Sequence, residues 1–192
     1  MNELIEDIES LFDKIKEPRF FEDNRPGGDI PYFILPYDIK LENEIDNQVL
    51  NLKKRLSNEG LNVLIINLYD VVIDILQKSI GLKRIFDLES KKDKAFFMRA
   101  LQSSIDMQLV FKPYIKKLIE KEKPQVIFIN GVAQVYPYLR SHIVLNNLQS
   151  ITGNCPVLMF YPGEYSGQTL KLFNTAEDAN YYRAYNIKTF HI

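Results

Sequence analysis

Polar side chains that can bind a ligand stand directly after four apolar segments of the sequence. In chain order, they are Tyr37 and Asp38, Tyr69 and Asp70, Asn130 with Gly131, and Gly163 with Glu164 and Tyr165. If the four segments are parallel strands, these side chains meet at one edge of a sheet, because ligands of open parallel sheets bind outside the carboxyl ends of the strands. Carboxylates, an amide and phenols at one edge can bind a cation, a polyol or a peptide.

Simpler structural roles compete with ligand binding at the same positions. Asp70 stands directly before an apolar helical run and is predicted to be the N-cap of that helix, and Asp38 can cap its helix or turn in the same way. Gly131 and Gly163 fit the backbone requirements of tight turns. Glu164 has no local capping partner in the sequence, so a functional or buried-pair role is open for it.

The sequence lacks the motifs of several large enzyme classes. It contains no G-x-x-x-x-G-K-[ST] loop and no G-x-G-x-x-G, so the phosphates of a nucleotide find no glycine-rich cradle. It contains no G-x-S-x-G nucleophile elbow either. We therefore favour a protein without enzymatic activity or cofactor. The alternative is a small-ligand site, a metal site or an enzyme centred on Asp38, Glu164 and Arg183.

One cysteine and two histidines offer little for thiol or metal chemistry. A single Cys155 excludes an internal disulfide and a thiolate metal cluster, fits a reducing cytoplasm, and is predicted to be buried and inert. Arg140 and His142 fall within a predicted helix and are interpreted as a satisfied helical pair rather than as a general base. No metal ligand set is expected.

Hydrophobic periodicity predicts the elements that position these residues. Helical spacing predicts helices at 2–16, 41–58, 70–78 and 132–150, a short helix or turn at 82–90, and a long helix at 92–121 that Pro113 kinks or breaks. Continuous apolar runs predict buried strands at 32–35, 63–68, 126–129 and 157–160, with a last strand within 184–190. The alternation favours one α/β domain over residues 1–192: a mostly parallel sheet of four or five strands, helices on both faces, and an added helical segment at about 78–122.

Charge and tyrosine are distributed unevenly along a chain whose net charge is −1. Residues 1–30 carry 9 acids and 4 bases, whereas residues 78–123 carry 12 bases and 6 acids. Residues 124–192 hold only 7 charged side chains but 7 of the 11 tyrosines. Because interface cores are poor in charge and rich in Tyr and Arg, the last third is the predicted functional surface. No apolar run is long enough to span a membrane, and the acidic amino terminus does not resemble a signal peptide.

The basic segment suggests nucleic acid as a second possible partner. Phosphate binding needs several cations on one face, and a predicted helix brings four lysines close together: Lys112, Lys116, Lys117 and Lys121. Solvated lysines on a helix exterior are the competing interpretation. Phe96 and Phe97 fall on the apolar stripe of the segment and are predicted to be core residues rather than stacking platforms.

Five segments in matching order resemble the BrxB family, which belongs to the BREX anti-phage defence system of bacteria. They cover residues 31–38, 131–142, 145–149, 156–165 and 180–185. The family-like positions that define the candidate functional surface are Tyr37, Asp38, Gly131, Tyr136, Arg140, His142, Gly163, Glu164, Tyr165, Tyr182 and Arg183.

This resemblance implies a cytoplasmic protein that acts within a multi-protein defence complex. The complex includes a DNA methyltransferase, a large ATPase and PglZ, an alkaline-phosphatase-like protein that is the first candidate for a direct partner. The family has no established activity, so the resemblance implies no catalytic residue. We expect a non-catalytic adaptor or scaffold; a ligand-binding crevice and DNA contact through the lysine-rich helix are the alternatives.

Overall fold

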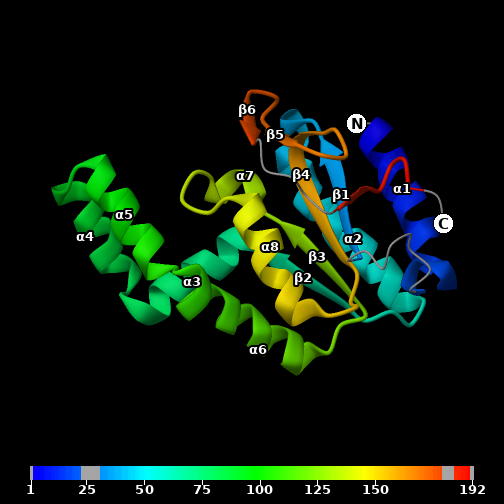
Figure 1. Ribbon diagram of the computed structural model, residues 1–192, viewed down its shortest axis with the longest axis horizontal. Helices are drawn as coiled ribbons and strands as arrows, with labels where there is room; N and C mark the ends of the chain where they lie inside the picture. Colours follow the sequence, from blue (N-terminus) through cyan, green and yellow to red (C-terminus); the bar gives the residue numbers. More distant parts are fainter. Residues whose placement is uncertain (1, 23–30, 179–183, 191–192) are drawn as a thin grey trace.

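The computed structural model describes residues 2–22, 31–178 and 184–190 (Figure 1). The first half contains α1 (Asn2–Lys16), the 3-10 helix η1 (Pro18–Phe21), β1 (Tyr32–Tyr37), the 3-10 helix η3 (Ile39–Leu41), α2 (Glu42–Asn58), β2 (Val63–Asn67), α3 (Leu68–Ser79) and α4 (Leu82–Lys91). The second half contains α5 (Lys94–Ser104), the π-helix η4 (Met107–Phe111), α6 (Lys112–Glu122), β3 (Val126–Asn130), α7 (Val132–Val135), α8 (Ser141–Thr152), β4 (Val157–Tyr165), β5 (Leu170–Leu172), β6 (Ala176–Asp178) and β7 (Tyr185–Asn186).

Five parallel strands form the centre of the sheet, in the order β2-β3-β4-β1-β7. The predicted mostly parallel α/β fold is therefore confirmed. The last strand expected within 184–190 is present as β7, whereas the sequence did not predict that β4 runs past the parallel sheet and pairs with β5, and β5 with β6, both antiparallel. The carboxyl ends of β1 and β4 lie side by side, with Tyr37 opposite Pro162.

Two apolar layers hold the helices on the two faces of the sheet. Successive strand residues alternate between them: Ile127 and Ile129 of β3 pack toward α3, α6 and α8, whereas Val126 and Phe128 pack toward α1 and α2. All five residues of β3 are buried, as expected of a parallel strand covered on both sides. The prediction of helices on both faces is confirmed (Figure 1).

The basic segment is helical as predicted, but its break lies elsewhere. The chain leaves the helix after Ser104, and Asp106 accepts hydrogen bonds from the backbone N–H groups of Gln108 and Leu109 at the start of η4. Pro113 lies in the first turn of α6, directly after the π-helical turn η4, and helical geometry continues across it. Phe96 is 41% exposed, so its placement in the core is wrong.

Two further expectations about the helices are corrected. The predicted helix at 132–150 is divided into α7 and α8, because Pro137 disfavours helical geometry at Tyr136, which is extended. His142 therefore lies in the first turn of α8 rather than in the middle of a helix. The N-cap of α3 is Asn67, not Asp70: the Asn67 side chain accepts hydrogen bonds from the backbone N–H groups of Tyr69 and Asp70.

Cys155 lies just before β4 and is half-buried rather than buried. Burial raises the pKa of its thiol to about 11, which keeps the thiol protonated near neutral pH. Over the part of the chain that the structure describes, no helix is both long and apolar enough to cross a membrane.

Candidate functional site

A pocket with a volume of about 320 Å³ opens at the carboxyl ends of β1 and β4. Its walls come from the ends of these two strands, the amino-terminal half of α1 and the last described residues of the chain. The lining residues are Glu3, Leu4, Asp7, Pro36, Tyr37, Asp38, Leu41, Gly163, Glu164, Tyr165, Asn174 and Lys188. We call it the strand-end pocket; it lies where ligands of open parallel sheets are expected to bind.

The extension of β4 forms one wall, and Gly163 makes that extension possible. Gly163 lies opposite Leu172 in the β4–β5 pair, with a φ of +151°. A Cβ atom at this position would lie 2.1 Å from the backbone oxygen of Lys171, so a side chain would push β5 away. Gly163 therefore meets a backbone requirement, as expected, but in a strand pair rather than in a turn: it allows β4 and β5 to approach closely.

The two acids expected to meet, Asp38 and Glu164, both line the strand-end pocket and both are exposed. Asp38 also caps η3, since its Oδ1 accepts a hydrogen bond of 2.9 Å from the Lys40 N–H. Glu164 faces Lys171 across the β4–β5 pair. The structure thus brings together residues from two distant parts of the sequence, as the parallel arrangement predicts.

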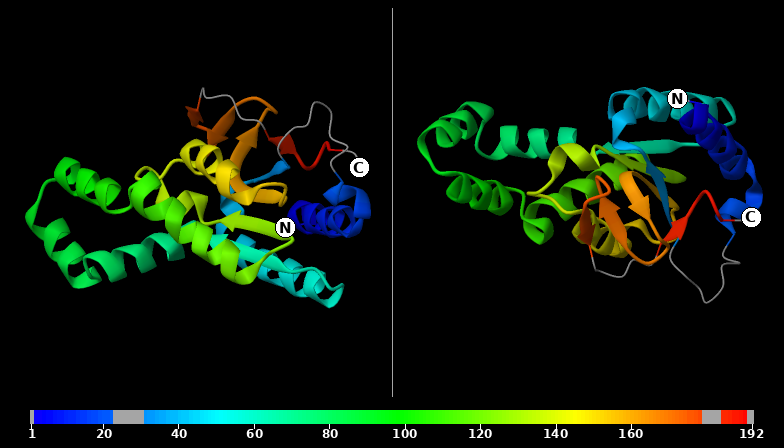
Figure 2. Two further views of the ribbon diagram at one scale, coloured as in Figure 1. Left: turned by 60° about the horizontal axis from the view of Figure 1, so that its bottom comes forward. Right: turned by 90° about the horizontal axis from the view of Figure 1, so that it is seen from above.

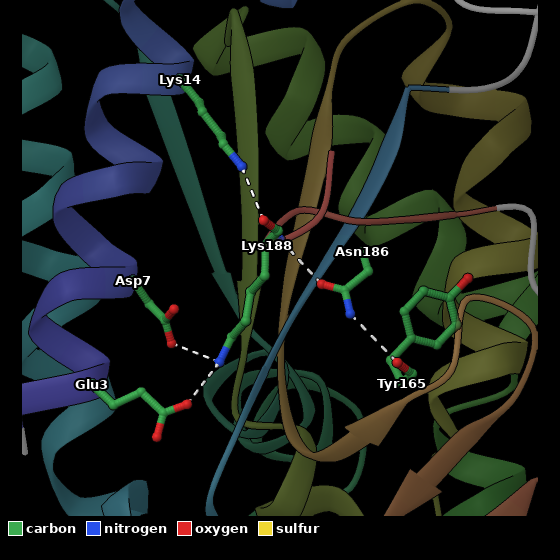
Figure 3. Close-up of polar contacts among 6 residues, drawn as sticks. All are labelled: Glu3, Asp7, Lys14, Tyr165, Asn186 and Lys188. Atoms are coloured by element: carbon green, nitrogen blue, oxygen red, sulfur yellow. Dashed lines mark hydrogen bonds and ion pairs between the residues drawn. The ribbon is translucent and has the colours of Figure 1, made fainter. Parts of the chain in front are cut away.

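Ion pairs between α1 and the carboxyl-terminal segment complete the pocket (Figure 3). The Lys188 Nζ lies 2.7 Å from an Asp7 oxygen and 3.6 Å from a Glu3 oxygen. Lys14 donates a hydrogen bond to the backbone oxygen of Ile187 on the same segment. Sequence reasoning missed Glu3, Asp7 and Lys188, because only the folded chain brings its two ends to this edge of the sheet.

Asn186 joins this segment to β4. Its Oδ1 accepts a hydrogen bond from the Lys188 N–H at 3.1 Å, and its Nδ2 contacts the backbone oxygen of Tyr165 at 3.4 Å (Figure 3). The Tyr165 hydroxyl donates a hydrogen bond of 2.7 Å to the backbone oxygen of Ala184. Tyr165 lines the pocket but is buried, and its hydroxyl holds the carboxyl-terminal segment.

Tyr37 is likewise buried and uses its hydroxyl inside the fold. It donates a hydrogen bond to a Glu42 carboxylate oxygen. Burial, this hydrogen bond and the nearby Asp46 carboxylate raise the pKa of Tyr37 well above its usual value. Burial also raises the pKa of Glu42, with a further contribution from Asp46. These contacts attach the start of α2 to the end of β1 and so position Asp38.

The end of β3 forms a separate polar cluster. Asn130 is only 4% exposed, and its Nδ2 donates a hydrogen bond of 2.6 Å to Asp46. Gly131 has a φ of +74°, and a Cβ there would lie 2.6 Å from Oδ1 of Asn67, the cap of α3. Neither Asn130 nor Gly131 lines the strand-end pocket, and Asp70 does not line it either. The four strand ends therefore do not converge on one site as expected; only β1 and β4 do.

Tyr136 and Arg140 lie at a second, much smaller pocket with Ser141 and Tyr161. Its volume of about 20 Å³ has room for roughly one water molecule. The Tyr136 ring packs edge-on against Phe173, with 6.0 Å between centroids, and is partly exposed. His142 follows at the start of α8. Tyr182 and Arg183 lie outside the described residues.

The four lysines predicted to contact DNA lie on α6, but acids accompany them. Lys116 lies 3.8 Å from Glu120, and Lys121 lies 3.2 Å from Glu122. Lys117 is exposed, whereas Lys112 is half-buried. The neighbouring carboxylates reduce the positive potential that a phosphate backbone would meet on this helix.

Fold and site together define an α/β protein with a mostly parallel sheet and a polar pocket at the carboxyl ends of two neighbouring strands. The family model described as "BREX protein BrxB" matches residues 64–187 of the chain. The BREX protein BrxB of Bacillus cereus (strain H3081.97) is 31% identical over 189 residues, which cover 97% of this chain and 98% of the relative. The BREX protein BrxB of Escherichia coli O9:H4 (strain HS) is 25% identical over 180 residues, covering 94% and 89%.

The chain therefore belongs to the BrxB family and is a BrxB-family protein of the BREX system. The resemblance inferred from its sequence segments is confirmed.

Proposed function

We propose that this chain is a non-catalytic adaptor in a BREX complex and binds a partner protein, with PglZ as the first candidate, through the strand-end pocket. One observation carries the proposal: family-like segments far apart in the sequence line the same pocket. Tyr37 and Asp38 come from the first segment, and Gly163, Glu164 and Tyr165 come from the fourth.

The chemistry of the pocket suits recognition of a protein surface. Asp38 and Glu164 are exposed, whereas Tyr37 and Tyr165 hold the walls from beneath. Lys188 adds a cation that is already paired with carboxylates of α1. Exposed charges at the edge of an interface determine partner choice and association rate more than total affinity. The adaptor would thus select its partner through the charges of Asp38 and Glu164, while the buried Tyr37 and Tyr165 hold the pocket walls in place.

A small-ligand site at the same place is the second candidate, and the pocket volume favours it. About 320 Å³ is at the lower end of the range, roughly 300–1,000 Å³, of small-molecule sites. With carboxylates on its walls, the pocket would accept a small molecule that carries a cationic group or hydroxyls.

Co-purification tests the adaptor proposal. The tagged chain is expressed with each BREX component separately, as wild type and as the double variant Asp38→Asn/Glu164→Lys. Asparagine keeps the oxygen that caps η3, so the first change removes charge without removing the cap. Glu59→Lys alters an exposed acid at the end of α2 and is the matched control.

The proposal predicts that wild type and Glu59→Lys retain one component, such as PglZ, and that the double variant loses it. Equal retention by all three proteins would contradict it. A thermal-shift screen with divalent metals, polyamines and nucleotides tests the second candidate: a shift that the double variant abolishes would support a ligand site, and no shift would remove it.

A further inference from the structure

The helices α4 and α5 form an arm that projects from the sheet (Figure 1). In each view the arm extends on one side of the molecule and α1 lies on the other (Figure 2). The two helices pack on each other and on α3. Ile85 and Leu101 are the buried side chains of α4 and α5, and both belong to the apolar layer of the body. The arm is thus anchored at its inner face, which leaves its outer surface free for another role.

Two phenylalanines on the arm face solvent. Phe86 of α4 is 62% exposed and Phe96 of α5 is 41% exposed. Within the described residues, no other phenylalanine is among the large exposed apolar side chains. Single exposed apolar residues are common, but aromatic side chains, Phe included, are enriched in protein interfaces. These two rings are large apolar side chains of the arm that the fold of this chain leaves in solvent.

The charge of the arm indicates the chemistry of its partner. Six exposed cations lie on it, namely Lys83, Arg84, Lys91, Lys92, Lys94 and Arg99, against three acids, namely Asp87, Glu89 and Asp93. The Lys92 Nζ lies over the Phe96 ring, 5.3 Å from its centroid, so a cation and an exposed ring form one unit. A complementary surface must be acidic and must offer apolar sockets for the rings.

We propose that the α4–α5 arm is a second docking surface, which binds an acidic protein surface through Phe86, Phe96 and the exposed cations of the arm. The three acids interspersed among the cations would repel a phosphate backbone. A protein surface can place its acids beside the arm's cations and away from the arm's acids. Because the arm and α1 lie on opposite sides, an adaptor of this shape can hold two partners at once.

The test measures the affinity of the purified chain for each purified BREX component, and for single-stranded and duplex oligonucleotides, at low and physiological salt. The variants are Phe86→Ser/Phe96→Ser and Lys91→Glu/Lys92→Glu. Leu50→Ser is the matched control, because Leu50 of α2 is an apolar side chain of similar exposure away from the arm. Far-ultraviolet circular dichroism verifies that each variant is folded, as expected for changes at exposed sites.

The proposal predicts one component whose affinity decreases at least tenfold with each arm variant, decreases with salt, and is unchanged by Leu50→Ser. The pocket variant Asp38→Asn/Glu164→Lys separates this result from the first proposal, because it must leave arm binding intact. The proposal is overturned if every component binds the arm variants as it binds wild type. It is also overturned if the variants abolish oligonucleotide binding instead, or if sedimentation shows that the arm joins two copies of the chain.

Discussion

Replacing Gly131 by alanine should reveal whether this glycine is required by the fold rather than by a ligand. The residue has a φ of +74°, which costs an alanine about 1 kcal/mol. The new Cβ would lie 2.6 Å from Oδ1 of Asn67, so the cap of α3 must move. That cap accepts hydrogen bonds of 3.0 and 3.2 Å, and its loss costs about 1 kcal/mol.

The expected total is about 2 kcal/mol, or a decrease in Tm of about 4–8 °C for a chain of this size. Gly60→Ala is the matched control: its φ is +84°, but no atom lies within 4 Å of the new Cβ. It should lose only the backbone part, about 1 kcal/mol and about 2–4 °C. Thermal and urea unfolding, followed by circular dichroism, measure both.

Equal destabilisation by the two alanines would refute the proposed clash with the cap. A double-mutant cycle adds a second check, because in an Asn67→Ala background the cap is already absent. Gly131→Ala should then cost only about 1 kcal/mol. A cost that stays near 2 kcal/mol would show that the contact with Asn67 is not its cause.

Three further predictions follow from the electrostatics. Since burial raises the pKa of Cys155 to about 11, its thiolate fraction at pH 8 is about 0.1%, against roughly a quarter for an ordinary thiol. Alkylation should therefore be about 250-fold slower than in the urea-unfolded chain, and equal rates would contradict this. In the folded state Tyr37 keeps its proton above about pH 10, where unfolded tyrosines ionise. The urea midpoint of unfolding should therefore decrease as the pH rises from about 9 to 11, and a constant midpoint would contradict this prediction. Lys188→Met removes contacts of 2.7 and 3.6 Å to Asp7 and Glu3 and should lower the free energy of unfolding by about 1 kcal/mol or less. This loss should become smaller in about 0.5 M salt, and a loss independent of salt would exclude an ionic origin.

Local patterns were sufficient to predict the main elements of the fold. The apolar runs at 126–129 and 157–160 are buried parallel strands, because only a sheet covered on both faces tolerates continuous apolar sequence. The spacing at 2–16 gave α1 with its observed bounds. The errors concern the ends of helices, which depend on individual capping side chains and on proline rather than on apolar spacing. Asn67 rather than Asp70 caps α3, since the helix begins inside an apolar run, and Pro137 divides a helix whose apolar spacing continues past it.

The sequence predicted only the part of the candidate site that follows from the parallel arrangement of the strands. Parallel strands imply that Asp38 and Glu164 meet, and both line the strand-end pocket. The contributions of Asp7 and Lys188 depend on how the two ends of the chain pack, which no local pattern contains. The expectation that tyrosines of the last third are surface residues is wrong for Tyr165, because its hydroxyl finds a backbone acceptor inside the fold.

The most direct test of the adaptor proposal is the dissociation constant of the purified chain and purified PglZ, measured by isothermal titration calorimetry. If the strand-end pocket is the binding surface, Asp38→Asn/Glu164→Lys should weaken binding by about tenfold or more, equivalent to about 1.4 kcal/mol, whereas Glu59→Lys should bind like wild type. An unchanged dissociation constant for the double variant would contradict the pocket as the binding surface, and no binding of wild type to PglZ would contradict PglZ as the partner.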